Sequence, residues 1–287
     1  MAVSAFPMTV NADMGPKASV RIQFEHMGDE LCYGTLLSKE KSTGPASAWD
    51  GRMESAPKEY MDPGIWEIFV NYKDPDGYYF LQRSWKVSES KELAWTYYPP
   101  GDFKILLYYP ETETFVSSGI YARYAFDTYY TVDMDGVDIG SVEYNDDLST
   151  NERIEAYRSY NYRQEMLALG ARIVLTILIE MLVALLFGFR QKKQLLILAV
   201  VNIITQIILN VLLNVINYNS GPLAFTFFYV LFELIVFALE AVLYCTILKR
   251  LSEKKKEDAY YILYSFVANL ISFGAGLFLA AKLPGMF

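Results

Sequence analysis

The sequence predicts a membrane protein in two parts: an all-β domain of the immunoglobulin-like sandwich type, followed by a four-transmembrane α-helical bundle. Four long apolar runs predict the bundle, because each is close to the roughly 20 residues that a helix needs to cross a bilayer core. They cover 171–189, 194–216, 223–248 and 259–281. Short aromatic and β-branched segments separated by turn residues predict the β domain, because this pattern is typical of antiparallel sheets.

Charge divides the chain at the same place. Up to Leu169 there are 27 acidic and 15 basic residues, whereas six acidic and ten basic residues follow. The front part is therefore an acidic, soluble-type sequence, and the back part is a membrane sequence with basic loops. Neither part has the basic face that nucleic-acid binding requires, so we expect no nucleic-acid partner.

The residues of common catalytic and metal sites are scarce. His26 is the only histidine, which excludes an HExxH zinc site and disfavours a Ser-His-Asp triad. Asp133, Asp135 and Asp138 do not have EF-hand spacing, so we interpret them as an acidic turn. Cys32 and Cys245 cannot build a disulfide framework, and we expect them on opposite sides of the membrane. The sequence thus predicts no enzyme, no cofactor and no metal site.

Residues 1–12 end in Val10-Asn11-Ala12, which matches the small-residue pattern of a signal-peptidase site. The segment lacks a basic n-region and a full apolar h-region. We interpret it either as the remnant of a signal peptide or as a disordered N-terminus.

Residues 13–147 form the predicted extracytoplasmic β-sandwich. Val20, Ile22 and Phe24 alternate with polar residues, the period of a half-buried strand. Two turns are predicted, one at 74–77 as a hairpin and one at 109–114, because Pro and Gly favour tight turns. Further strands are predicted at 31–37, 65–72, 78–87, 92–98, 103–109, 114–124 and 128–133, with one long loop at 38–63. Seven or eight such strands indicate an antiparallel immunoglobulin-like sandwich.

At residues 148–170 the spacing of the apolar side chains changes to that of a helix, which predicts a juxtamembrane helical stalk. Ser149 and Glu152 fit a capping box. Ile154, Tyr157 and Met166 then recur among charged residues, so we expect a mostly polar helix that continues through Gly170 into the membrane.

Loop charges predict the topology of the membrane domain, 171–287. The loop after the first run and the loop after the third run are basic, and basic loops stay in the cytoplasm. Their basic residues are Arg190, Lys192 and Lys193, and Lys249, Arg250, Lys254, Lys255 and Lys256. We therefore expect a multi-pass plasma-membrane protein with the N-terminal domain and the C-terminus extracytoplasmic.

Polar residues inside the apolar runs form the candidate site: Glu180, Asn202, Gln206, Asn210, Glu233 and Glu240, with Asn214 continuing the amide spacing. A charge at the centre of a membrane helix costs at least roughly 2.5–3.5 kcal/mol, so three carboxyl groups need an explanation. Counting from the helix ends places Glu180, Gln206 and Glu233 at one level. Asn202 and Glu240 fall at a second level nearer the cytoplasm.

Three interpretations of this polar site are open. It is a proton- or cation-coupled pathway, or a polar pocket for a small ligand. Alternatively, its members are hydrogen-bonding groups that only hold the helices together. In the third interpretation, the polar stripe docks another membrane protein.

Several stretches resemble a recurrent pattern in uncharacterised multi-pass membrane proteins of Gram-positive bacteria. TILIE (176–180), NIITQIILN (202–210) and FELIVFALEAVLY (232–244) are similar to their membrane helices. DMGPKASVRI (13–22) and WTYYPPGDFKILLYYPETETF (95–115) are similar to their exported domains. The resemblance implies a bacterial plasma membrane and an extracytoplasmic domain, and it implies no activity.

The order of sandwich, stalk and bundle suggests a sensor- or adaptor-like protein whose extracytoplasmic domain binds a ligand or partner. Because its cytoplasmic loops are short, such a protein needs a membrane-protein partner in the lipid bilayer. The alternative is a small transporter or ion-coupled carrier, alone or as a homo-oligomer, that uses Glu180, Glu233 and Glu240.

Overall fold

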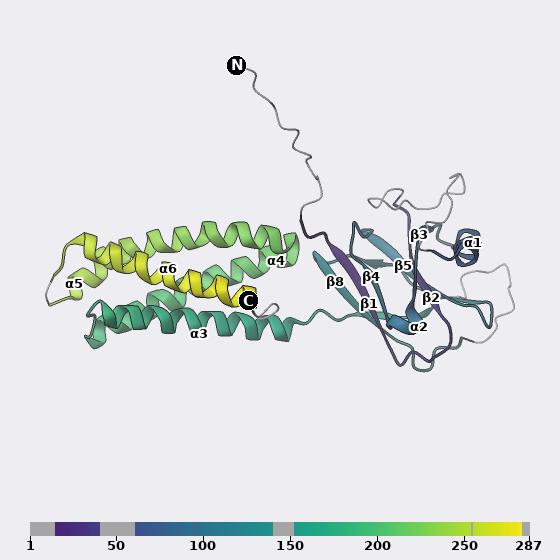
Figure 1. Ribbon diagram of the computed structural model, residues 1–287, viewed down its shortest axis with the longest axis horizontal. Coiled ribbons are helices and arrows are strands. Elements are labelled where there is room, and N and C mark those ends of the chain that lie inside the picture. Colours follow the sequence, from purple (N-terminus) through teal and green to yellow (C-terminus); the bar gives the residue numbers. More distant parts are fainter. Residues whose placement is uncertain (1–14, 41–60, 140–151, 254, 283–287) are drawn as a thin grey trace, which may run out of the picture. The chain divides into compact units, whose positions relative to one another are not determined.

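The computed structural model describes residues 15–40, 61–139, 152–253 and 255–282, which belong to two compact units, Met1–Tyr160 and Asn161–Phe287 (Figure 1). The predicted signal-peptide remnant, residues 1–12, lies outside the described residues, and so does most of the predicted loop at 38–63.

The first unit contains two β-sheets (Figure 1). Its strands are β1 (Ser19–Glu25), β2 (Tyr33–Ser38), β3 (Tyr79–Lys86), β4 (Glu92–Trp95), β5 (Asp102–Tyr109), β6 (Thr114–Ser118), β7 (Tyr121–Ala122), β8 (Asp127–Asp133), β9 (Glu152–Ile154) and β10 (Ala156–Arg158). One sheet has the order β10-β8-β1-β4. The other has the order β3-β2-β5-β6-β9, and β7 pairs with β5.

The two sheets share one apolar core. The alternation predicted for β1 is confirmed, because Val20, Ile22 and Phe24 are all buried. They pack in one cluster with Trp95 of β4 and Phe103 of β5, which belongs to the other sheet. Burial of these large side chains is the main source of stability for the unit.

A helix, α1 (Pro63–Asn71), replaces the strand predicted at 65–72. The Asp62 carboxylate accepts a hydrogen bond from the Ile65 amide at 3.0 Å, and Pro63 follows the cap, a combination that starts helices. Phe69 of α1 packs with Leu106 of β5, whereas Leu107 belongs to the core between the sheets. Successive strand residues point to opposite faces, so α1 covers the outer face of the larger sheet.

The predicted turn at Asp74–Gly77 exists, with Gly77 at a φ of 72°. It joins α1 to β3 and is not the turn of a β-hairpin. The turn predicted at 109–114 does join a hairpin, because Tyr109 of β5 pairs with Thr114 of β6. A short helix, α2 (Val87–Ser90), separates β3 from β4.

The sheets are mixed, and the prediction of a purely antiparallel sandwich was wrong. β1 pairs with β8 in parallel, and so does β6 with β9. A parallel pair needs a long crossover connection, and the chain between β1 and β8 supplies one by running through the other sheet. Local sequence patterns carry no information about such distant pairings.

The predicted helical stalk at 148–170 is helical only over 162–170, the first turns of α3 (Tyr162–Leu186), and strands replace the described part before it. β9 and β10 occupy 152–158, where Ile154 is buried in the core of the sheets and Tyr157 pairs with Thr131 of β8. The helix begins only at Tyr162, because the Asn161 side chain caps it by accepting a hydrogen bond from the Gln164 amide. Pairing with distant strands therefore outweighed the local helical period.

The second unit is helical. It contains α3 (Tyr162–Leu186), α4 (Lys192–Leu243), a π-helical turn η2 (Tyr244–Leu248), α5 (Lys249–Leu251) and α6 (Asp258–Lys282). Three helices are long and apolar enough to cross a membrane: Tyr162–Leu186, Lys192–Leu251 and Asp258–Leu279. They run side by side (Figure 1) and leave many leucine and isoleucine side chains exposed, as lipid-facing helices do.

The longest helix, α4, folds back on itself at Gly221. This residue has φ 81° and ψ −178°, a backbone conformation that is essentially restricted to glycine, and Pro222 follows it. Residues 35 and 42 positions apart then meet, because Thr205 bonds to Glu240 and Tyr244 bonds to Asn202. We call residues 192–220 the first limb and residues 222–243 the second limb. The limbs are antiparallel and correspond to the second and third apolar runs.

Candidate functional site

A buried polar network joins α3, both limbs of α4 and α6. Glu240 of the second limb is completely buried and uses both carboxyl oxygens. Oε1 accepts a hydrogen bond from the Thr205 hydroxyl at 3.0 Å, and Oε2 accepts one from the Asn269 amide at 2.7 Å. Glu240 thus connects the first limb and α6 to the second limb.

Glu180 is the carboxyl group that α3 contributes, and it is also completely buried. Its Oε1 accepts a hydrogen bond from the Ser272 hydroxyl at 3.3 Å, and its backbone carbonyl accepts one from Tyr264 at 3.4 Å. Its Oε2 has no hydrogen-bonding partner within the described part of the chain. An unsatisfied polar atom in a membrane interior is costly, so Glu180 retains capacity to bind a further group.

Asn202 lies next to the π-helical turn. Its Oδ1 accepts a hydrogen bond of 2.9 Å from Tyr244, the first residue of η2. Short π-helical turns inside α-helices are frequent at functional sites. Its Nδ2 is buried and has no partner among the residues that the structure describes.

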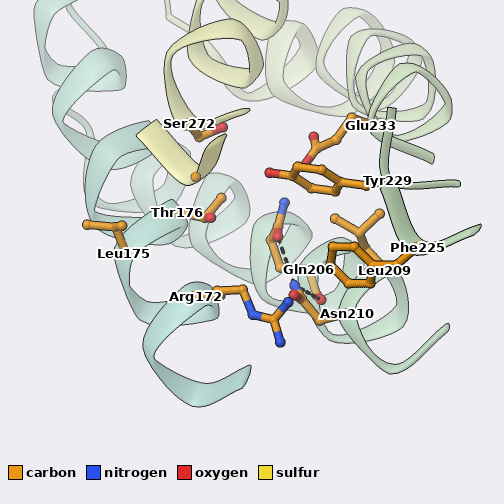
Figure 2. Close-up of a pocket in the computed structure, with 11 residues that line it drawn as sticks. Arg172, Leu175, Thr176, Gln206, Leu209, Asn210, Phe225, Tyr229, Glu233 and Ser272 are labelled. Atoms are coloured by element: carbon orange, nitrogen blue, oxygen red, sulfur yellow. Dashed lines mark hydrogen bonds between the residues drawn. The ribbon is translucent and has the colours of Figure 1, made fainter. Parts of the chain in front are cut away.

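A cavity of about 40 Å³ lies beside this network (Figure 2). Its walls come from α3, both limbs of α4 and α6: Arg172, Leu175, Thr176, Gln206, Leu209, Asn210, Phe225, Tyr229, Glu233, Ser272 and Gly276. One water needs about 10–15 Å³ of such volume, so the cavity holds a few waters or one small ion. Ser272 links the cavity to Glu180.

Gln206 and Asn210 form the cavity wall of the first limb. The Asn210 amide donates to the Gln206 backbone carbonyl at 2.8 Å and to its Oε1 at 3.2 Å. The Gln206 side chain is therefore oriented with its oxygen engaged. Its Nε2 is buried and has no partner among the described residues.

Glu233 and Tyr229 form the wall of the second limb (Figure 2). Glu233 Oε2 is buried without a partner in the described ranges. The Tyr229 ring lies between Phe225 and Phe273, with centroid distances of 6.0 and 5.1 Å. Its hydroxyl occupies space that only a glycine at position 276 leaves free, since a Cβ there would lie 2.7 Å from it.

Arg172 closes the cavity at the α3 side (Figure 2). Its Nη2 donates to Asn214 Oδ1 at 3.3 Å, and its guanidinium lies 5.8 Å from the centre of the Phe225 ring. Its Nε is buried without a partner within the described segments.

The structure divides the six predicted residues between two neighbouring places. Gln206, Asn210 and Glu233 line the cavity. Glu180, Asn202 and Glu240 lie in the buried network. A functional role for these six residues stays a prediction.

Several participants were missed, Thr205 and Tyr244 among them. Arg172 and Tyr229 line the cavity, Asn269 bonds to Glu240, and Ser272 bonds to Glu180. Asn269 and Ser272 are three positions apart in the fourth run, so they share a helix face, and this spacing was a usable signal.

No protein-family model matches this chain, and no curated protein sequence or solved structure is significantly similar to it. Among the described residues, no group of three or more His, Cys, Asp and Glu side chains is placed to hold a metal ion. The function must therefore be argued from the geometry of the bundle.

Proposed function

We propose that this chain is a multi-pass plasma-membrane protein whose bundle acts as a small carrier coupled to protons or a small cation. The observation that supports this most is the cavity of about 40 Å³, with Glu233 in its wall and Glu180 one hydroxyl away. Carboxyl groups inside membrane helices are costly and commonly belong to ion or proton pathways. The cavity volume suits a proton, a small ion and waters, and it does not suit a large organic ligand.

The proposed path begins at Glu233 and continues to the buried acids. Glu233 lines the cavity and has a buried carboxyl oxygen without a partner among the described residues. Ser272 lines the same cavity and donates to Glu180, so its hydroxyl is placed to relay a proton between them. Glu240 holds the limbs and α6 together through Thr205 and Asn269.

The proposed topology has four crossings, one for α3, one for each limb of α4 and one for α6. The basic residues gather at the α3–α4 connection and around α5, which supports a cytoplasmic position for both connections by the positive-inside rule. The two-sheet unit and the C-terminus are then extracytoplasmic.

Glu233→Gln tests the carrier. Full-length protein in liposomes is given a membrane potential, and proton uptake is followed with a pH-sensitive dye in the presence of a panel of small anions and cations. We expect wild-type uptake above that of empty liposomes and at least a roughly ten-fold loss in the variant, since loss of a general acid or base typically costs 10²–10⁴-fold. Glu253→Gln, an exposed position between α5 and α6, is the matched control. Wild-type uptake equal to that of empty liposomes with every ion would overturn the proposal.

A sensor or adaptor is the second candidate, and the front unit favours it. We propose that this unit is immunoglobulin-like and binds a partner through its exposed strands. Tyr79, Tyr98, Tyr129 and Tyr157 are between 36% and 52% exposed there, and exposed tyrosines are enriched in protein interfaces. Gentle extraction from the native membrane followed by mass spectrometry tests it. A stoichiometric membrane partner that still co-purifies with the Glu233→Gln variant supports the adaptor. Purification of the protein alone or as a homo-oligomer contradicts it.

A further inference from the structure

Arg172 places a permanent positive charge at the wall of the cavity. Arginine cannot lose its proton in a protein, so this charge cannot be removed by deprotonation. Its guanidinium donates a hydrogen bond to a neutral amide, Asn214, and among the described residues it forms no ion pair within 4.0 Å. A cation held among membrane helices is costly unless another charge balances it.

Two unpartnered polar atoms of the residues that line the cavity are donors. Arg172 Nε and Gln206 Nε2 are both buried, both lack a partner among the described residues, and both residues line the cavity. The acceptor atom of Gln206 is already occupied by Asn210, and that of Asn214 by Arg172. Figure 2 shows the Gln206 side chain between Arg172 and Tyr229, with its amide nitrogen on the Tyr229 side. A permanent positive charge and unpartnered N–H donors in the wall of one cavity are groups that bind an anion.

The cavity restricts the size of that anion. Its volume of about 40 Å³ admits an ion the size of chloride, nitrate or formate with little water. Leu175, Leu209 and Phe225 supply apolar walls on three sides. These walls strengthen the electrostatic interaction, because they exclude water from it.

We propose that the cavity binds one small monovalent anion beside Arg172, and that this anion is the substrate that moves with the proton. Transport rests on the proposed carrier function, whereas binding does not. Glu233 lines the same cavity, so its negative charge opposes the anion and its protonation favours it. By linkage, the anion and the proton then each strengthen the binding of the other.

The other charged and titratable groups near this cavity are few. Glu165 and Tyr229 interact electrostatically with Arg172, and Glu240 interacts with Glu233. Glu180 is linked to the cavity through Ser272, and α6 contributes only Ser272 and Gly276 to its wall. Glu233 is the carboxyl group that lines the cavity itself. Glu233→Gln should therefore remove most of the pH dependence of anion binding.

Binding of ³⁶Cl⁻, and its displacement by nitrate and formate, is measured by equilibrium dialysis on full-length protein in nanodiscs between pH 5 and 8. We expect saturable binding of one anion per chain, with affinity that falls as pH rises. Arg172→Gln should weaken binding about ten-fold or more, as expected for loss of a hydrogen bond to a charged group. Arg163→Gln, an exposed arginine of the same helix, should bind like the wild type.

Two further variants keep the test decisive. Gln206→Met keeps Arg172 and the side-chain volume but removes the second donor, so it should also weaken binding if Arg172→Gln fails to fold. Glu233→Gln should retain binding and lose most of its pH dependence. Absence of saturable binding in the wild type, or equal binding by folded Arg172→Gln and wild type, overturns the anion site. Proton uptake without anion binding leaves the carrier standing and refutes the anion site. Anion binding without proton uptake refutes the carrier, and with it the transport of the anion, but leaves the anion site standing.

Discussion

Lys104 shows how strongly one residue can hold the β unit together. Its side chain is completely buried on β5, where Nζ lies 3.1 Å from Asp74 Oδ1 and 2.5 Å from Asp76 Oδ2. Asp74 is also completely buried, so removing the lysine leaves a carboxylate without its counter-charge. We expect Lys104→Met to destabilise the unit by about 3–5 kcal/mol.

Urea unfolding of the full-length protein in detergent measures this, with tryptophan fluorescence as the signal. All four tryptophans precede residue 96, so the signal reports on the β unit. Lys86→Met is the matched control, because Lys86 pairs with Glu89 at the surface and exposed pairs contribute about 0–1 kcal/mol. Equal midpoints for the two variants would contradict the role given to Lys104.

His26 is predicted to titrate at higher pH than a free histidine. Its Nδ1 lies 2.8 Å from Asp133 Oδ1, and this hydrogen bond, together with the carboxylate charge, raises the pKa of His26 above 6.5. Folding therefore favours the protonated ring. The stabilisation is complete below about pH 6.5 and is lost as pH rises through the folded-state pKa.

The single histidine makes this measurable by NMR of full-length protein labelled at the imidazole. We expect a titration midpoint above 6.5 that moves down in Asp133→Asn. Asp135 and Glu25 also raise the pKa, so the return is partial. A midpoint that stays unchanged in the variant would show that the pair does not form.

At the scale of elements, the fold-back of α4 depends on Gly221. A side chain at φ 81° and ψ −178° is strained, at a cost of about 1–3 kcal/mol. We expect Gly221→Ala to lower the thermal stability of the bundle, measured by helical circular dichroism in detergent. Gly274→Ala is the control, because Gly274 is helical and nothing lies within 4 Å of the added carbon. Alanine there should be neutral or stabilising by up to about 1 kcal/mol.

Elements whose signals are local were predictable, and those that depend on distant partners were not. The alternation of β1 and the apolar runs come from adjacent residues, and both are present in the structure. β9 and β10 form because they pair with β6 and β8, so the helix predicted over 152–158 was wrong there, whereas 162–170 is helical. At α1 a local signal was available and overlooked, namely Asp62 followed by Pro63.

At the scale of the whole molecule, only part of the candidate site could be predicted from the sequence. Isolated carboxyl groups and amides stand out in apolar runs, so Glu180, Gln206 and Glu233 were found. Ser272 and Tyr229 do not stand out, because hydroxyl and aromatic residues are common in membrane helices. Their proximity to the acids depends on how α6 packs against the limbs, and no pattern within one helix specifies that packing.

Thiol labelling of intact cells tests the topology that the carrier requires. Cys245→Ser provides the background. Cys32 stays in place, because burial raises the pKa of its thiol to about 12 and the reactive thiolate is scarce. Single cysteines then replace Glu111 in the β5–β6 turn, Ser220 at the fold-back of α4, and Lys193 at the start of its first limb, all of them exposed.

A membrane-impermeant maleimide should label Glu111→Cys and Ser220→Cys in intact cells, and Lys193→Cys only after permeabilisation. The reason is that a first limb of about 29 residues is about 43 Å long, enough to separate Lys193 from Ser220 by a full bilayer core. Labelling of Lys193→Cys and Ser220→Cys from one side would show that the limbs do not each cross the membrane. If only Lys193→Cys were labelled in intact cells, the orientation would be the opposite of the proposed one, with the β unit in the cytoplasm.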